Sequence, residues 1–72
     1  MTDSPPTVVV NGEPRTVAGL TVTDLLVVLE TPADGRGVAV AIDGEVVRRT
    51  DWSERTLRAG ERVEVLTAIQ GG

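Results

Sequence analysis

Several residue types that carry much of protein chemistry are missing from this 72-residue chain, which has no cysteine, histidine, lysine, tyrosine or phenylalanine. Nucleophilic catalysis usually recruits cysteine, lysine or a hydroxyl activated by histidine, and proton transfer near neutral pH most often uses histidine. Thiolate and imidazole metal sites are excluded as well, and the scattered carboxylates form no calcium-binding loop. We therefore expect a protein that is not an enzyme and that binds no metal ion or cofactor.

Length, charge and hydropathy limit the partners. A domain of 72 residues buries only about 60% of the surface of its unfolded chain, which leaves no room for a deep cleft. The net charge is −4 and the 7 basic residues, all arginine, are spread out, whereas nucleic-acid binding requires a basic patch. The polar segment 1–7 lacks the features of a signal peptide, and no apolar run reaches membrane-spanning length. We expect a cytoplasmic monomer with neither nucleic acid nor membrane as a partner.

The first predicted elements are the two strands of a hairpin. An apolar run over residues 7–11 ends in Asn11-Gly12, a pair that accepts the positive φ angles of a tight turn. The return strand is expected over residues 15–18. Pro14 fits an edge strand or a strand start, where its missing N–H is not needed.

A short helix should follow this hairpin. Thr21 is a candidate N-cap, and Asp24 stands three residues later as the acidic half of a capping box. Pro32 should end the helix near Glu30. Apolar residues recur at i, i+3, i+4 and i+7, which places one stripe against a core: Val22, Leu25, Leu26 and Leu29.

A second hairpin is predicted in the middle of the chain. Residues 38–42 form an apolar strand, and Asp43-Gly44 leads into a return strand over residues 45–48. Residues 51–54 are compatible with a single helical turn. Trp52 and Leu57 are expected to cover one end of the core, with a partner contact as the alternative for Trp52.

The last predicted strand spans residues 62–67. It places Val63 and Val65 on one face and Leu66 on the other. The predicted order is therefore strand, strand, helix, strand, strand, strand. One sheet packed on one helix is the least that buries all these apolar faces, which makes the predicted fold α+β.

The chain closes with Gly71-Gly72, shortly after this last strand. Because glycine has no side chain, two terminal glycines can lie extended in a channel too narrow for a Cβ atom, with the terminal carboxylate leading. A partner that joins this carboxylate to AMP makes the acyl group electrophilic, and attack by a sulfur donor then leaves a thiocarboxylate. A frayed chain end is the simpler interpretation, but the pair follows a terminal strand in a domain that otherwise lacks reactive groups.

The sequence resembles the ubiquitin-like β-grasp proteins, and most closely the family of thiazole-biosynthesis sulfur carriers called ThiS. The resemblance covers residues 8–72. It depends on the order and spacing of several fragments: Val10-Asn11-Gly12-Glu13, Thr23-Asp24-Leu25-Leu26, residues 38–47, Trp52 and residues 60–72.

The resemblance implies a topology, a reaction and a set of partners. The first and last strands would lie parallel at the middle of a mixed sheet of about four to five strands on one helix. An ATP-dependent adenylyltransferase related to ubiquitin-activating enzymes would adenylate Gly72. A sulfur-donor protein would convert it to a thiocarboxylate, and thiazole synthase would take the sulfur for the thiazole ring of thiamine. ATP would be used by the adenylyltransferase, not bound by this chain.

The predicted site lies near the carboxyl end. Gly72 is the residue to be modified, and Gly71 and Gly72 together enter the active sites of partners. Leu66, Ile69 and Gln70 are predicted to contact partners, although Leu66 and Ile69 are equally consistent with an ordinary core. The matching division of the chain is a flexible extension over residues 1–6, a β-grasp domain over 7–68 and a flexible tail over 69–72.

Other functions stay open on the sequence. The small subunit of molybdopterin synthase shares the fold, the Gly-Gly end and the thiocarboxylate, but such subunits tend to be longer and richer in aromatic residues. A carrier for cysteine biosynthesis is a further alternative. A protein modifier would attach its tail to lysines of target proteins, and a plain interaction module would not need its last two residues.

Overall fold

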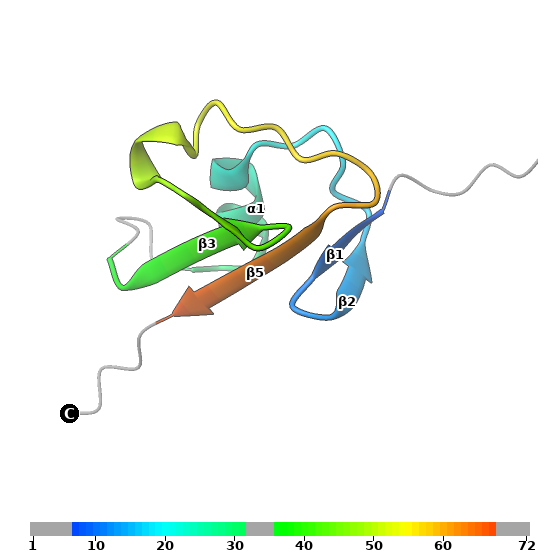
Figure 1. The fold of residues 1–72 in the computed structure, drawn as a ribbon, viewed down its shortest axis with the longest axis horizontal. Helices are drawn as coiled ribbons and strands as arrows, with labels where there is room; N and C mark the ends of the chain where they lie inside the picture. Colours follow the sequence, from blue (N-terminus) through cyan, green and yellow to red (C-terminus); the bar gives the residue numbers. More distant parts are fainter. Residues whose placement is uncertain (1–6, 32–35, 68–72) are drawn as a thin grey trace, which may run out of the picture.

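Five strands, one α-helix and one single-turn 3-10 helix make up the part of the chain that the computed structural model describes, residues 7–31 and 36–67 (Figure 1). Their order confirms the predicted strand, strand, helix, strand, strand, strand. The predicted flexible segments, residues 1–6 and 69–72, lie outside the described residues. The elements are β1 (Val8–Val10), β2 (Glu13–Arg15), α1 (Val22–Val28), β3 (Val38–Ile42), β4 (Glu45–Val47), η1 (Arg49–Asp51) and β5 (Arg62–Thr67).

The first hairpin is tighter than the sequence analysis predicted. Asn11 and Gly12 have φ angles of 50° and 84°, as a two-residue hairpin turn requires. Such a turn leaves no spare residue between the strands, so Glu13 pairs directly with Val10. The return strand is therefore Glu13–Arg15, and the prediction of residues 15–18 is wrong.

Helix α1 begins as predicted. The Thr21 hydroxyl accepts a hydrogen bond from the Asp24 N–H at 3.2 Å, and the Asp24 carboxylate accepts one from the Thr21 N–H at 3.2 Å. This reciprocal pair is the expected capping box. The last helical residue is Val28 and Leu29 is the C-cap, because Glu30 has a φ of 58° that a right-handed helix does not allow. In the described ranges no helix is long and apolar enough to cross a membrane.

The segment after β4 folds slightly earlier than expected. The 3-10 helix spans Arg49–Asp51 instead of residues 51–54, because the Asp51 N–H already bonds to the Arg48 carbonyl at 2.8 Å. Trp52 is only 6% exposed, and its Nε1 donates to the Val47 carbonyl at 3.0 Å. A buried and satisfied indole confirms the core interpretation of Trp52.

Strand β5 is the centre of a five-stranded sheet with the order β2-β1-β5-β3-β4. On one side β1 runs parallel to it, with Val10 opposite Val63. On the other side β3 runs antiparallel to it, from Val38 opposite Thr67 onwards. The parallel pairing of the first and last strands, which the resemblance implied, is confirmed. Strand β2 lies at the edge, where Pro14 costs no ladder hydrogen bond.

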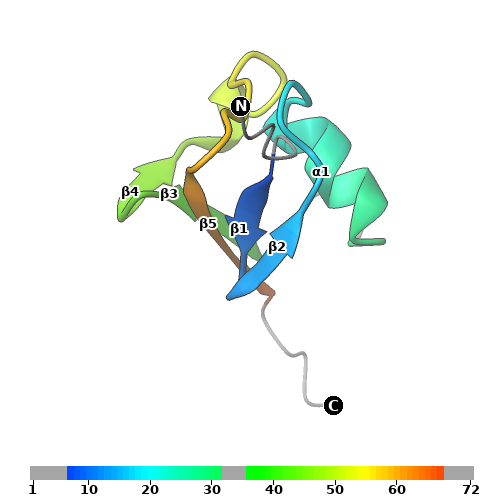
Figure 2. The same cartoon turned by 90° about the vertical axis from the view of Figure 1, so that its right-hand side faces the viewer.

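The core lies between α1 and one face of this sheet (Figure 2). Alternate strand residues point inward, while Leu29 is only partly buried at the margin. The arrangement is the predicted α+β fold. Its buried cluster comprises Val8, Val10, Val17, Val22, Leu25, Leu26, Val40, Ile42, Trp52, Leu57, Val63 and Val65.

The helix offers a direct test of this core, because Leu25 is 0% exposed and Val27 is 72% exposed on the same helix. Leu25→Ala should lower the free energy of unfolding by about 2–5 kcal/mol, since it removes apolar contacts and leaves a cavity. Val27→Ala should change it by less than about 0.5 kcal/mol. Urea unfolding measures both values, and similar losses for the two variants would contradict the described packing.

Candidate functional site

The predicted tail, residues 69–72, begins two residues after the end of β5 at Thr67. Thr67 is the last described residue, and Ile69, Gln70, Gly71 and Gly72 lie outside the described residues. The described part of the site is therefore the root of the tail, formed by β5 and the segments that hold it. Figure 1 shows β5 running through the sheet toward this end of the chain.

The two edges of β5 bond to different neighbours, because successive main-chain groups of a strand point to opposite sides. The Asn11 N–H donates to the Val63 carbonyl at 2.9 Å, so Val63 faces β1. The Asp43 N–H donates to the Arg62 carbonyl at 2.8 Å, so Arg62 faces β3. By the same alternation, Val65 faces the β1 side.

The side chains of two turn residues add hydrogen bonds near the two ends of β5. The Asn11 side-chain amide donates from Nδ2 to the Val65 carbonyl at 3.1 Å and accepts at Oδ1 from the Val65 N–H at 2.8 Å. Toward the other end, Asp43 Oδ1 accepts from the Arg62 N–H at 3.0 Å. The sequence analysis assigned Asn11 and Asp43 to turns only and missed these bonds, since no local signal connects residues that are 54 and 19 positions apart.

The outer face of the sheet, opposite α1, carries exposed apolar residues. Leu66 is 68% exposed, whereas Val65 beside it is 7% exposed. Leu66 is thus a surface residue, and the partner contact predicted for it stays a prediction. The register places Ala39 next to Leu66 and Ala41 next to Val46. The apolar residues of this face are Val9, Ala39, Ala41, Val46 and Leu66, of which Val9 and Ala41 are half-buried.

A shallow groove lies on this face between the first hairpin and β5. It contains one guanidinium, from Arg62, and one carboxylate, from Glu64. The groove brings Asn11 of the turn to the same surface as Leu66 of the tail root. Its lining residues are Val9, Asn11, Gly12, Arg62, Val63, Glu64 and Leu66.

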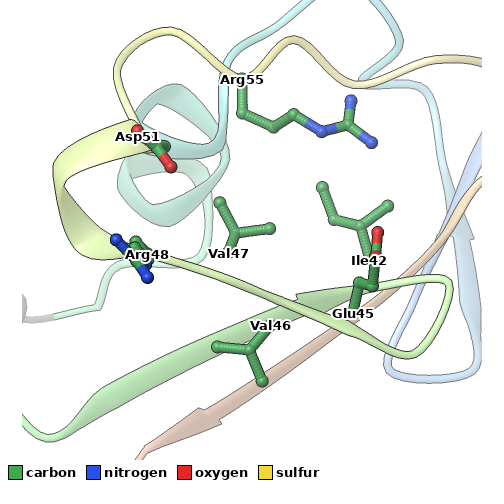
Figure 3. Close-up of a pocket in the computed structure, with 7 residues that line it drawn as sticks. All are labelled: Ile42, Glu45, Val46, Val47, Arg48, Asp51 and Arg55. Atoms are coloured by element: carbon green, nitrogen blue, oxygen red, sulfur yellow. The ribbon is translucent and has the colours of Figure 1, made fainter.

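A second hollow lies beside β4 and η1 (Figure 3). Its charged side chains surround the apolar Ile42 and Val47, and the guanidinium of Arg55 is held by Glu61 at 2.7 Å. The lining has two arginines and two carboxylates but no hydroxyl, thiol or imidazole side chain. Across residues 7–31 and 36–67, no group of three or more histidine, cysteine, aspartate or glutamate residues is arranged to hold a metal ion. The full lining is Ile42, Glu45, Val46, Val47, Arg48, Asp51 and Arg55.

Known proteins resemble this chain over most of its length. A sequence model of the ThiS family matches residues 8–72. A curated protein of Thermus thermophilus, named sulfur carrier protein ThiS, is 39% identical over 62 residues. That match covers 86% of this chain and 94% of the Thermus protein.

Solved structures agree with the sequence comparison. The crystal structure of a thiamine biosynthesis protein (ThiS) from Geobacter metallireducens superposes with a TM-score of 0.73 at 38% identity, covering 92% of this chain and 99% of that one. A solution structure of a thiamine biosynthesis protein from the same organism gives a TM-score of 0.74 at 38% identity, covering 92% and 87%. The ubiquitin-like β-grasp topology, the family match through the terminal glycines and these similarities together place the chain in the ThiS family.

Proposed function

We propose that this chain is a sulfur carrier protein whose reacting group is the terminal carboxylate of Gly72. A partner adenylyltransferase joins that carboxylate to AMP from ATP and releases pyrophosphate. A donor protein then delivers sulfur at the oxidation level of sulfide. A C–S bond forms, the bond from the carbonyl carbon to the AMP oxygen breaks, and a thiocarboxylate and AMP result. Thiazole synthase takes this sulfur for the thiazole ring of thiamine.

The observation that carries the proposal is the family match through Gly72, five residues beyond the end of the central strand. Five extended residues reach about 17 Å. That length is enough for the terminal carboxylate to enter a partner's active site while the folded domain stays outside it. Glycine at the last two positions suits a narrow entry channel, since neither residue has a Cβ atom.

The residue inventory supports the same chemistry. The chain has no cysteine, so it has no thiol on which to hold sulfur as a persulfide. The terminal carboxylate remains a group that an adenylyltransferase can activate without any side chain. Catalytic groups for activation and transfer then belong to the partners, which fits the absence of histidine and lysine from this sequence.

The partner must also bind the folded domain, and this requires a contact surface near the tail. We assign the contact to Leu66, Ile69 and Gln70, because Leu66 is 68% exposed and stands three residues before the start of the tail at residue 69. Full burial of a leucine side chain contributes about 1.5–3 kcal/mol. Covering Leu66 in a complex therefore provides a useful share of the binding free energy, at the point where the partner must also admit the tail.

Two tail variants test the proposed reaction. Gly71→Val adds a branched Cβ that should block entry into the channel while leaving the carboxylate in place. A single alanine added after Gly72 keeps both glycines but displaces the carboxylate by about 3.3–3.6 Å. Both variants should fold normally, and both should lose pyrophosphate release with the cognate adenylyltransferase, because a displacement of about 1 Å can cost 100-fold in rate.

The extended variant is the more informative of the two. Its thermal unfolding should match the wild type, which serves as the folding control. Activation of the extended chain at the normal rate, with intact mass showing that it was not trimmed first, would contradict the assignment of Gly72 as the reacting terminal residue.

Leu66→Thr tests the docking contact. Threonine is β-branched and therefore favours a strand, and it removes apolar bulk, so kcat/KM for adenylation should fall about tenfold, with little change in melting temperature. Val27→Thr is the matched control, because Val27 is 72% exposed on α1, on the other side of the sheet. Equal effects of the two variants on kcat/KM would argue against a contact at Leu66.

A further inference from the structure

We propose that Asn11 is a positioning residue for the tail: its side-chain amide holds the end of β5 and so sets the direction in which residues 68–72 leave the sheet. The role of that direction in adenylation rests on the function proposed above. The hold on β5 itself is a property of this fold and can be measured without any partner.

Strand β5 extends beyond the end of β1, so part of its main chain requires other hydrogen-bond partners. The parallel ladder between β1 and β5 ends at Val10 opposite Val63. The chain then turns away through Asn11 and Gly12, while β5 continues to Thr67. The N–H and carbonyl of Val65 therefore face a side from which the neighbouring strand has departed.

The Asn11 side chain replaces the missing strand. Its Oδ1 accepts from the Val65 N–H at 2.8 Å and its Nδ2 donates to the Val65 carbonyl at 3.1 Å. These are the acceptor and the donor that the main chain of a longer β1 would have offered. One amide group thus extends the ladder by one bonded residue although the main chain has already turned.

The residue at each turn matches the main-chain groups of β5 that lack a strand partner there. Position 11 needs a side chain with both a donor and an acceptor at a φ of 50°, and asparagine provides both and tolerates that conformation. Position 43 has a similar φ of 51°, but there the main-chain N–H of Asp43 already donates to the Arg62 carbonyl. Only an acceptor is still needed for the Arg62 N–H, and a carboxylate supplies it.

The bonds to Val65 lie close to the end of β5, so they restrict how the strand end can tilt. Among the described residues, they are the last hydrogen bonds that β5 receives from the β1 side, two residues before Thr67. Without them, the end of β5 is paired with β3 alone. A tilt of about 10° at this point moves the tip of a five-residue tail presented in extended form by about 3 Å, so the tip meets the entry of a partner's channel less often.

The test compares Asn11→Gly with Asp43→Gly. Both residues have a positive φ, both precede a glycine and both hold β5 by a side chain. Glycine accepts the turn conformation at each position, so each variant removes the hold and keeps the hairpin. The two holds differ in place: one lies toward the tail, and the other at the start of β5.

Amide hydrogen exchange gives the first result, without any partner. Asn11→Gly should speed exchange at Val65 relative to the wild type, because the Val65 N–H loses its acceptor, and Asp43→Gly should do so at Arg62 instead. Unchanged exchange at Val65 in Asn11→Gly would overturn the proposal, whether or not the wild-type chain is a substrate of an adenylyltransferase.

Pyrophosphate release by the cognate adenylyltransferase gives the second result. Asn11→Gly should lower kcat/KM about tenfold, mainly through a higher KM, because a tail that is already seated takes its direction from the partner's channel. Asp43→Gly should leave kcat/KM within about twofold of the wild type. Equal losses in the two variants would reduce Asn11 to a general stabilising residue. A loss in Asn11→Gly without faster exchange at Val65 would assign Asn11 to direct partner contact; either outcome overturns the positioning role.

Asn11→Asp separates the two bonds. It keeps the acceptor for the Val65 N–H and the size of the side chain, but it replaces the donor with a second acceptor that faces the Val65 carbonyl. Its kcat/KM should fall between those of the wild type and Asn11→Gly. A value equal to the wild type would show that the Nδ2 bond is dispensable and would contradict the two-bond hold. Inactivity of the wild type itself would count against the proposed function, and the exchange data would still decide the role of Asn11.

Discussion

The parallel pairing of β1 with β5 is the constraint on which the rest of the fold depends. It joins segments more than fifty residues apart, as the 54-residue separation of Asn11 and Val65 illustrates. Closing so long a loop costs conformational entropy, which grows only with the logarithm of its length. Burial of Val8 and Val10 against Val63 and Val65 at the middle of the core offsets this cost. The last strand therefore lies at the centre of the sheet, where it cannot detach without opening the core.

This central position gives the carboxyl end a fixed root. β5 is paired on both sides and is held near each end by the side chain of a turn residue. The face opposite α1 leaves Leu66 exposed beside the exit of the tail. A domain so poor in reactive side chains can contribute to chemistry through the end of its main chain. The proposed function has two physical requirements: a strand that is held firmly in the sheet before the tail, and a tail tip without Cβ atoms.

Local signals predicted much of this fold. Thr21 and Asp24 form their capping box, and the bounds of the strands at residues 38–42 and 62–67 are as expected, because capping and period-two patterns depend on neighbours in sequence. The first return strand was misplaced because a two-residue turn sets the register at Glu13 and leaves no loop. Periodicity carries no information on strand order, so the parallel centre of the sheet came from the resemblance to ThiS proteins.

Local sequence patterns predicted less of the candidate site than of the fold. The Gly-Gly end was visible in the sequence, but the chemistry proposed for it is argued from the similarity to the ThiS family. The exposure of Leu66 depends on which face of the sheet α1 covers, and that is a property of the whole fold. The bonds from Asn11 to Val65 link distant positions, so neither residue alone reveals them. The sequence explained the turn at Asn11 but not the choice of asparagine there.

The most direct measurement of the carrier function is the location of sulfur on the protein. The wild-type chain is incubated with its adenylyltransferase, ATP and the sulfur donor, and its intact mass and fragment masses are then recorded. A thiocarboxylate at Gly72 predicts one increase equal to the replacement of oxygen by sulfur, found only in fragments that contain Gly72. The same increase in a fragment that lacks Gly72, or a chain that releases pyrophosphate but never gains sulfur, would contradict it.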